Sequence, residues 1–176
     1  MLFSLLILAY IIAYFSFQSQ LHINKKQAGI KTIGKHIFKV LVLSMILTFP
    51  YLSEKLIKII IVITLLQGII DYFNYKIFYF LKKKFSCSSF ELELFLLEQG
   101  LHIFSIIIFI PFLNSISVNN MFINIQNYLI NCYPFISFLN KEIIGYMALS
   151  LSIIIFNFNG STFIVRSVLK KYQSDI

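Results

Sequence analysis

Five apolar runs separated by short polar stretches constrain this chain more than any other feature. They occupy residues 1–17, 37–52, 56–73, 90–113 and 143–159. A helix needs roughly 20 mainly apolar residues to cross a bilayer. Inside the hydrocarbon every backbone polar group must be paired, which favours helices. The pattern therefore predicts an all-α fold, a polytopic membrane helix bundle with about five transmembrane helices.

Composition excludes a water-soluble globular domain. Of 176 residues, 59% are hydrophobic and only 12% are charged, whereas a soluble domain carries roughly 25% charged residues. We therefore expect a single integral membrane domain over residues 1–176. Residues 1–17 lack the basic start and small-residue cleavage site of a signal peptide, so we interpret them as a retained span.

The net charge of +8 comes from basic residues that flank the apolar runs. They form no stripe or motif for reading bases, which argues against a nucleic-acid partner. If the N-terminus lies outside, five spans put twelve of the fifteen basic residues in the cytoplasm, as the positive-inside rule requires. We predict a multi-pass protein of the bacterial inner membrane with a cytoplasmic C-terminus. The twelve are Lys25, Lys26, Lys31, Lys35, Lys39, Lys76, Lys82, Lys83, Lys84, Arg166, Lys170 and Lys171.

Two further segments are expected outside the spans. Residues 119–133 place apolar side chains at helical spacing and asparagines on the other faces, which predicts an amphipathic helix at the membrane interface. We expect Gly160 to break or hinge the fifth span, leaving a basic C-terminal helix over 161–173. The predicted topology puts Cys87 and Cys132 on opposite membrane sides, so we expect no disulfide between them.

Polar residues inside the spans are the most informative about function. A charge near the bilayer centre costs about 2.5–3.5 kcal/mol on insertion scales. Gln67 and Asp71 are four residues apart, as are Glu98 and His102, so each pair shares one helix face. On antiparallel neighbouring helices the two pairs would meet at similar depth, and His36 could join from the edge. We expect one intramembrane polar cluster in the cytoplasmic half: Gln18, Gln67, Asp71, Glu98, Gln99 and His102.

Two interpretations of this cluster remain open. Buried polar residues can simply hydrogen-bond across membrane helices, at roughly 0.6–2 kcal/mol each. Alternatively the cluster handles protons or binds an ion, with Asp71, Glu98 and His102 as candidate metal ligands. The sequence contains no nucleotide loop, serine-centred elbow or zinc-protease helix motif. We therefore assign no catalytic residue and no cofactor.

Three segments resemble an uncharacterised bacterial membrane family, domain-of-unknown-function family 3307. The family's first helix reads A-H-x-x-x-D-F-x-x-Q, and AYIIAYFSFQ keeps Ala9, Phe15 and Gln18. Its later patterns H-x-x-I-D and D-Q-x-x-H are similar to QGIID and EQGLH here. The ending GSTFIVRSVLKK also resembles the family's closing helix. The order and spacing of these short motifs identify the chain as a divergent member.

The departures from the family pattern fall on polar positions. Tyr10 and Tyr14 stand where the family has His and Asp, Gln67 replaces a His, and Glu98 replaces a shorter carboxylate. A site of repeated His and carboxylate would be metal-like, and this chain has lost much of that ligand set. The resemblance brings no known activity.

These observations favour a non-enzymatic membrane component, a small permease-like or accessory subunit that moves or senses a small solute or proton. One alternative is a membrane-embedded, metal-dependent enzyme acting on a lipid-linked substrate. Another is an effector or immunity protein of a bacterial conflict system. The lipid bilayer is the expected partner, and a protein partner or a second copy of the chain stays an open alternative.

Overall fold

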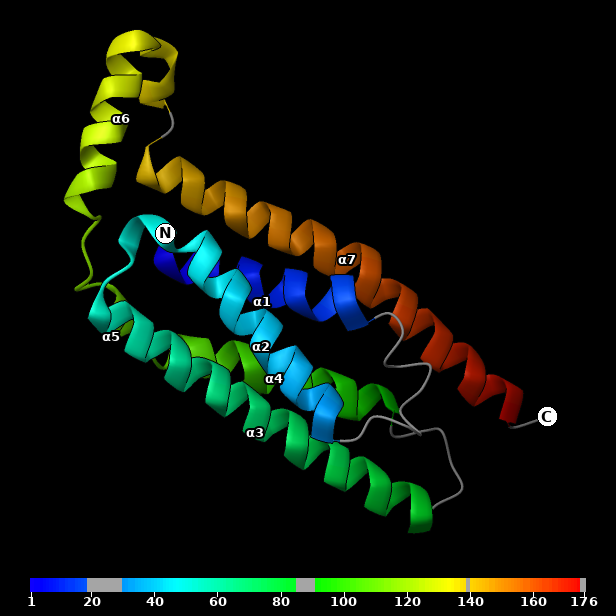
Figure 1. Ribbon diagram of the computed structural model, residues 1–176. Coiled ribbons are helices and arrows are strands. Elements are labelled where there is room, and N and C mark those ends of the chain that lie inside the picture. Colours follow the sequence, from blue (N-terminus) through cyan, green and yellow to red (C-terminus); the bar gives the residue numbers. More distant parts are fainter. Residues whose placement is uncertain (19–29, 85–90, 139, 175–176) are drawn as a thin grey trace.

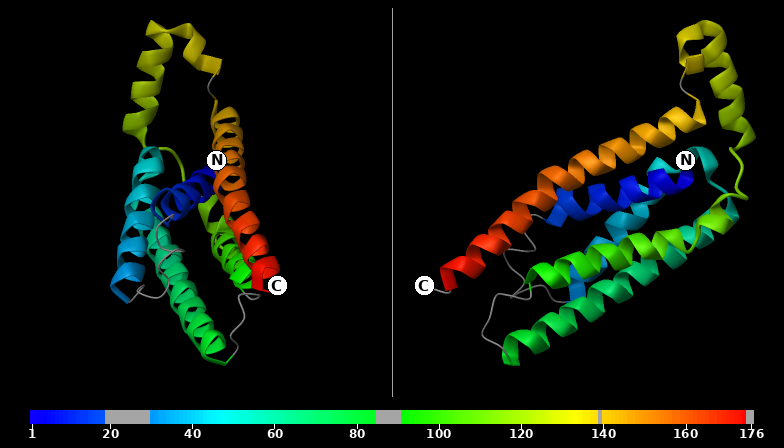
Figure 2. Two further views of the ribbon diagram at one scale, coloured as in Figure 1. Left: turned by 90° about the vertical axis from the view of Figure 1, so that its right-hand side faces the viewer. Right: turned by 180° about the vertical axis from the view of Figure 1, so that it is seen from behind.

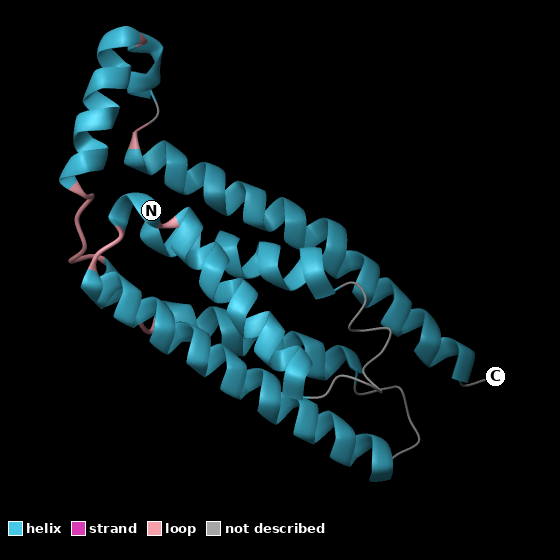
Figure 3. Ribbon diagram, in the orientation of Figure 1, coloured by secondary structure: helices cyan, strands magenta, loops and turns pink. Residues whose placement is uncertain are grey.

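The computed structural model describes residues 1–18, 30–84, 91–138 and 140–174, and every regular element among them is helical (Figure 3). This confirms the all-α prediction. The elements are α1 (Leu2–Gln18), α2 (Ile30–Leu47), η1 (Phe49–Tyr51), α3 (Glu54–Lys84), α4 (Glu91–Ile107), α5 (Ile110–Leu113), α6 (Asn120–Cys132), η3 (Pro134–Phe138) and α7 (Lys141–Ser174).

The long helices α1, α2, α3, α4 and α7 run up and down along one bundle (Figure 1). One end carries the N-terminus, η1, α5 and the beginning of α7. The other end carries the end of α1, the beginnings of α2 and α4, and the ends of α3 and α7 (Figure 2). We call this second end the basic end, because Lys35 and Lys76 lie near it, with residues 82–84 and 166–171.

Helix α1 is the centre of the bundle. It packs against α7, α2 and α4, and its sequence LFSLLILAYIIAYF is apolar on all sides. A helix that is hydrophobic all round is expected to be buried. Nearly every described side chain of α1 is indeed buried, and Ala9, Ala13 and Tyr14 have no exposed surface. The small Ala9 and Ala13 let neighbouring helices approach closely.

Side-chain caps fix where three of the helices begin. The hydroxyl of Ser53 accepts a hydrogen bond from the Leu56 amide at the start of α3. Asn119 accepts one from the Met121 amide at α6, and Asn140 accepts one from the Ile143 amide at α7. Each cap pairs a backbone donor that the first helical turn leaves unsatisfied.

The outer surface of the bundle is too apolar to face water. Large side chains on α3, α4 and α7 are at least half exposed, among them Leu65, Phe73, Leu97, Phe104 and Phe158. Within the described ranges, three helical segments are long and apolar enough to cross a membrane: Glu54–Leu81, Leu92–Leu113 and Lys141–Thr162. Leu2–Phe15 is a shorter apolar helix. Lipid is the solvent that would cover such a surface.

Two prolines and a glycine explain where the helices depart from the apolar runs. Pro111 lies four residues after Ile107, and its ring would clash with that carbonyl in a continuous helix, so α4 ends at Ile107. Pro50 lies in η1, after the end of α2. The expected break at Gly160 is wrong, because α7 is one helix from Lys141 to Ser174. A single glycine costs a helix only about 1 kcal/mol, and its neighbours here favour helix.

Helix α6 extends beyond the end of the bundle that is opposite the basic end (Figure 1). None of its residues is buried. It is attached through the Asn119 amide, which donates to the Pro50 carbonyl, and through Phe122, whose ring lies edge-on to Phe49 at 5.5 Å. A helix of this amphipathic pattern forms as expected, and its position at the membrane interface stays a prediction. Cys132 is a free, exposed thiol, whereas Cys87 lies outside the described residues.

Candidate functional site: a buried histidine–carboxylate cluster

The centre of the site is a contact between Asp71 on α3 and His102 on α4. His102 Nε2 lies 3.0 Å from Asp71 Oδ1. The His102 side chain has no exposed surface and that of Asp71 is 8% exposed. The two residues come together because α3 and α4 are antiparallel neighbours. A carboxylate without such a partner would be strongly destabilising in this interior.

Glu98 adds a second carboxylate from one helical turn before His102. It is buried, and one oxygen accepts a hydrogen bond from the Asn74 side-chain amide on α3. One potential ligand atom each from Asp71, Glu98 and His102 lie within 4.8 Å of one another. The two neighbouring helices therefore place an imidazole and two carboxyl groups around one point.

His36 on α2 approaches the same point from the opposite side of Asp71. Its Nε2 lies 3.8 Å from Asp71 Oδ2, and this buried atom has no hydrogen-bond partner among the described residues. Next to His36 on α2, the Ile37 side chain lies against Gly68 of α3, where a Cβ would meet the Ile37 Cδ1 and Cγ1 atoms. Together, His36, Asp71, Glu98 and His102 form what we call the histidine–carboxylate cluster.

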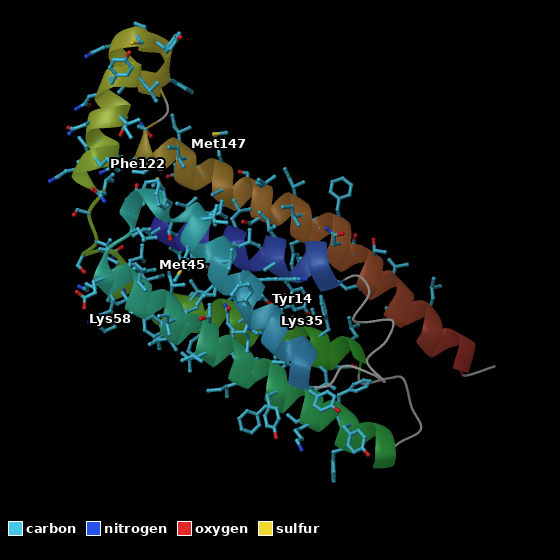
Figure 4. The ribbon with its side chains drawn as sticks, in the orientation of Figure 1. Tyr14, Lys35, Met45, Lys58, Phe122 and Met147 are labelled. Atoms are coloured by element: carbon cyan, nitrogen blue, oxygen red, sulfur yellow. The ribbon has the colours of Figure 1, made fainter. Side chains whose placement is uncertain are left out.

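Two tyrosines of α1 cover the cluster from the centre of the bundle. The Tyr10 ring lies 4.9 Å from the His102 ring, and the Tyr14 ring lies 5.9 Å from His36 and 6.4 Å from His102, centroid to centroid. Figure 4 labels Tyr14 in the interior of the bundle, away from the protruding Lys58 and Phe122. Phe95, also buried, packs against Tyr14 with the two rings tilted and their centroids 6.3 Å apart. Aromatic rings thus exclude water from one side of the cluster.

The remaining residues of the predicted cluster have different surroundings. Gln99 accepts a hydrogen bond of 3.0 Å from the Tyr10 hydroxyl. Gln67 is 2% exposed, and neither atom of its amide has a hydrogen-bond partner among the described residues. Gln18 ends α1, and its side chain lies outside the described part of the structure. The structure therefore brings Asp71, Glu98 and His102 together, with Gln67 and Gln99 buried nearby in sequence.

Sequence reasoning left out three residues of the site. The predicted cluster did not include Tyr10 and Tyr14, although both stand at positions that depart from the family pattern. Asn74 was missed because an asparagine near the end of an apolar run is common. Its spacing of three residues from Asp71 puts both on one face of α3, and this was the available signal.

The electrostatics of the cluster favour occupation by a cation. With both carboxyl groups ionised and one imidazole protonated, its net charge is still −1. Burying an uncompensated charge costs several kcal/mol even after relaxation. Lys35 and Lys39 on α2 lie within one turn of His36 along the helix. A proton or a metal ion held between the carboxyl groups and imidazoles of the cluster would lower the free-energy cost of burying this negative charge.

The cluster lies near the middle of the span-capable helices. Asp71 is ten residues, or about 15 Å, from the end of the Glu54–Leu81 segment. His102 is likewise ten residues, about 15 Å, from the start of the Leu92–Leu113 segment. Both distances are measured from the basic end. The cluster is therefore remote from both ends of the bundle.

Comparison with known proteins gives the family of the chain. The model of the family described as "Protein of unknown function (DUF3307)" matches residues 2–130. This range contains the whole histidine–carboxylate cluster and both tyrosines, but not the ending at 160–171, whose resemblance stays a prediction. The comparisons with curated proteins and with solved structures gave no match. Because the family model covers well over half of the sequence, the chain belongs to the DUF3307 family.

Proposed function

We propose that this protein is a non-enzymatic integral membrane component that takes up and releases protons at the histidine–carboxylate cluster. The observation that carries the proposal is the 3.0 Å contact between His102 and Asp71, buried beside Glu98. Histidine is the side chain whose ordinary titration lies closest to physiological pH. An ionisable group inside a membrane span is costly and is therefore a candidate for a functional site.

The same proposal includes an orientation of the bundle in the membrane. All five long helices cross the bacterial inner membrane, with the buried α1 shielded from lipid by its neighbours. The basic end faces the cytoplasm, since it collects most of the lysines and arginines. The cluster is then reached from the cytoplasmic half of the bundle. A small permease-like or accessory subunit would use it to move or sense a proton or a small solute.

Proton flux into liposomes tests the proposal. Purified protein is reconstituted with a pH-sensitive dye inside, and a potassium diffusion potential drives protons inward. We expect flux in the wild type, its loss in Asp71→Asn, and its retention in Thr64→Val, whose buried hydroxyl lies outside the cluster. Equal flux in the wild type and in Asp71→Asn would contradict the proposal.

A further inference from the structure

We infer that the histidine–carboxylate cluster is a binding site for a divalent first-row transition-metal ion, with zinc as the representative. Its ligands would be Nε2 of His36, Nε2 of His102 and one carboxylate oxygen each from Asp71 and Glu98. The inference rests on the proposed function, because the metal ion would compete with protons for the same atoms. The inference identifies the metal ion as the solute that exchanges with protons at the cluster.

The donor set selects the class of ion. Imidazole nitrogen suits zinc, iron, nickel and copper, and carboxylate oxygen is accepted by zinc and iron as well. Zinc sites are most often four-coordinate and tetrahedral. Magnesium and calcium prefer oxygen-only surroundings with six or more ligands. Two nitrogens and two oxygens in a dry interior therefore favour a transition metal.

The distances between ligand atoms are compatible with one shared ion. Ligands at 2.0–2.2 Å from a tetrahedral ion lie about 3.3–3.6 Å apart. His102 Nε2 and Asp71 Oδ1 are 3.0 Å apart, and His36 Nε2 and Asp71 Oδ2 are 3.8 Å apart. The ligand atoms of Asp71, Glu98 and His102 all lie within 4.8 Å. The Asp71, Glu98 and His102 atoms thus surround one point, whereas His36 Nε2 faces the other Asp71 oxygen and would join the ion only after its side chain shifts.

His36 supplies the independent indication of a ligand. It is 6% exposed, and its Nε2 faces Asp71 without a hydrogen-bond partner among the described residues. Buried side-chain nitrogen and oxygen atoms are normally paired, so an orphan requires an explanation. Coordination of a metal ion would satisfy this atom.

Charge and surroundings fit the same ion. Two neutral imidazoles and two carboxylates carry −2, which a divalent cation cancels. Metal binding requires deprotonated ligands and therefore releases any proton that the cluster holds. The Asn74 amide fixes a Glu98 oxygen, as outer-shell partners of ligands do. Tyr10, Tyr14 and Phe95 form the dry wall beside the two histidines.

Zinc binding by the purified full chain tests the inference. Protein in detergent is stripped with a chelator and titrated with zinc by calorimetry in two buffers that differ in ionisation enthalpy. A background in which Cys87 and Cys132 are both replaced by Ser removes thiols that could bind zinc elsewhere. We expect one zinc per chain with release of protons, and binding about 100-fold weaker in His36→Gln and Glu98→Gln.

Two controls keep the outcome decisive. Glu54→Gln removes an exposed carboxylate and should leave zinc affinity unchanged. Cobalt added to the protein with both cysteines replaced by Ser should give the intense visible absorption of tetrahedral coordination, a readout that needs no substitution within the cluster. Absence of stoichiometric zinc, together with a pale, octahedral cobalt spectrum, would overturn the metal site. Protonation changes that persisted at the cluster would then leave the proposed function standing.

Discussion

Two regions of the bundle interior bury polar side chains in different ways. Towards η1, the Thr48 hydroxyl donates to the Ser44 carbonyl, and the Thr64 hydroxyl donates to the Ile60 carbonyl, each within its own helix. In the histidine–carboxylate cluster, Asp71 faces His102 across two helices, and His36 Nε2 has no hydrogen-bond partner among the described residues. The first region is satisfied by local structure, whereas the second depends on three helices meeting correctly. Only the second holds groups whose charge can change.

Removing the carboxylate of Asp71, which both histidines face, should have the largest effect on stability. Asp71→Ala leaves His102 and His36 without their acidic neighbour in a buried site. We expect the free energy of unfolding to fall by about 3 kcal/mol, since one partner of a buried ion pair is lost. Denaturant unfolding in mixed micelles measures the change. A loss below that of Thr64→Val would show that the contact is not formed.

Gly68 tests whether α2 has to approach α3 closely. In Gly68→Ala the new methyl would meet Ile37, and overpacking of this kind costs roughly 1–3 kcal/mol. The double substitution Gly68→Ala with Ile37→Ala should recover part of that loss, because the clashing atoms are gone. The same unfolding assay checks both variants. Gly100→Ala is the matched control, because a Cβ there meets nothing within 4 Å.

A smaller effect is expected at the edge of the cluster. Tyr10→Phe deletes the hydroxyl that donates to Gln99 and keeps the ring beside His102. One membrane-buried hydrogen bond is worth about 0.6 kcal/mol on average, so we expect a stability loss near 1 kcal/mol or less. A double-mutant cycle with Gln99→Ala isolates the bond. Purely additive losses would mean that the two side chains do not interact.

The smallest effect should come from the locally satisfied region. Thr64→Val keeps the side-chain shape, and the Ile60 carbonyl retains its helical hydrogen bond. We expect a change of about 0.5 kcal/mol or less, as for hydroxyls that only share a carbonyl. A loss as large as that of Asp71→Ala would erase the contrast between the two regions.

Rules that use only neighbouring residues predicted the features of this fold that lie within single helices. The apolar runs indicated the long helices, and the i, i+4 spacing put Glu98 and His102 on one face of α4. The predicted fourth run continued to Leu113, whereas Pro111 ends α4 at Ile107. Gly160 did not end α7, because a glycine lowers helix stability without forbidding the helix.

The rest of the site depends on contacts between different helices, which the spacing of residues along the sequence does not predict. Tyr14 comes to lie between His36 and His102 only because α1 occupies the centre of the bundle. His36 faces Asp71, and Ile37 lies against Gly68, both across the contact between α2 and α3. Asn74 on α3 donates a hydrogen bond to Glu98 on the neighbouring helix α4. None of these partners is visible in a single stretch of sequence.

The central claim is that the cluster changes its protonation in the folded protein, and infrared difference spectroscopy tests it most directly. Spectra of the protein in lipid are compared between mildly acidic and neutral pH. We predict a carboxyl C=O band of a buried acid that appears on acidification, shifts in Glu98→Gln or Asp71→Asn, and is unchanged in Thr64→Val. A spectrum without such a band, or with one that both cluster variants leave untouched, would contradict the account.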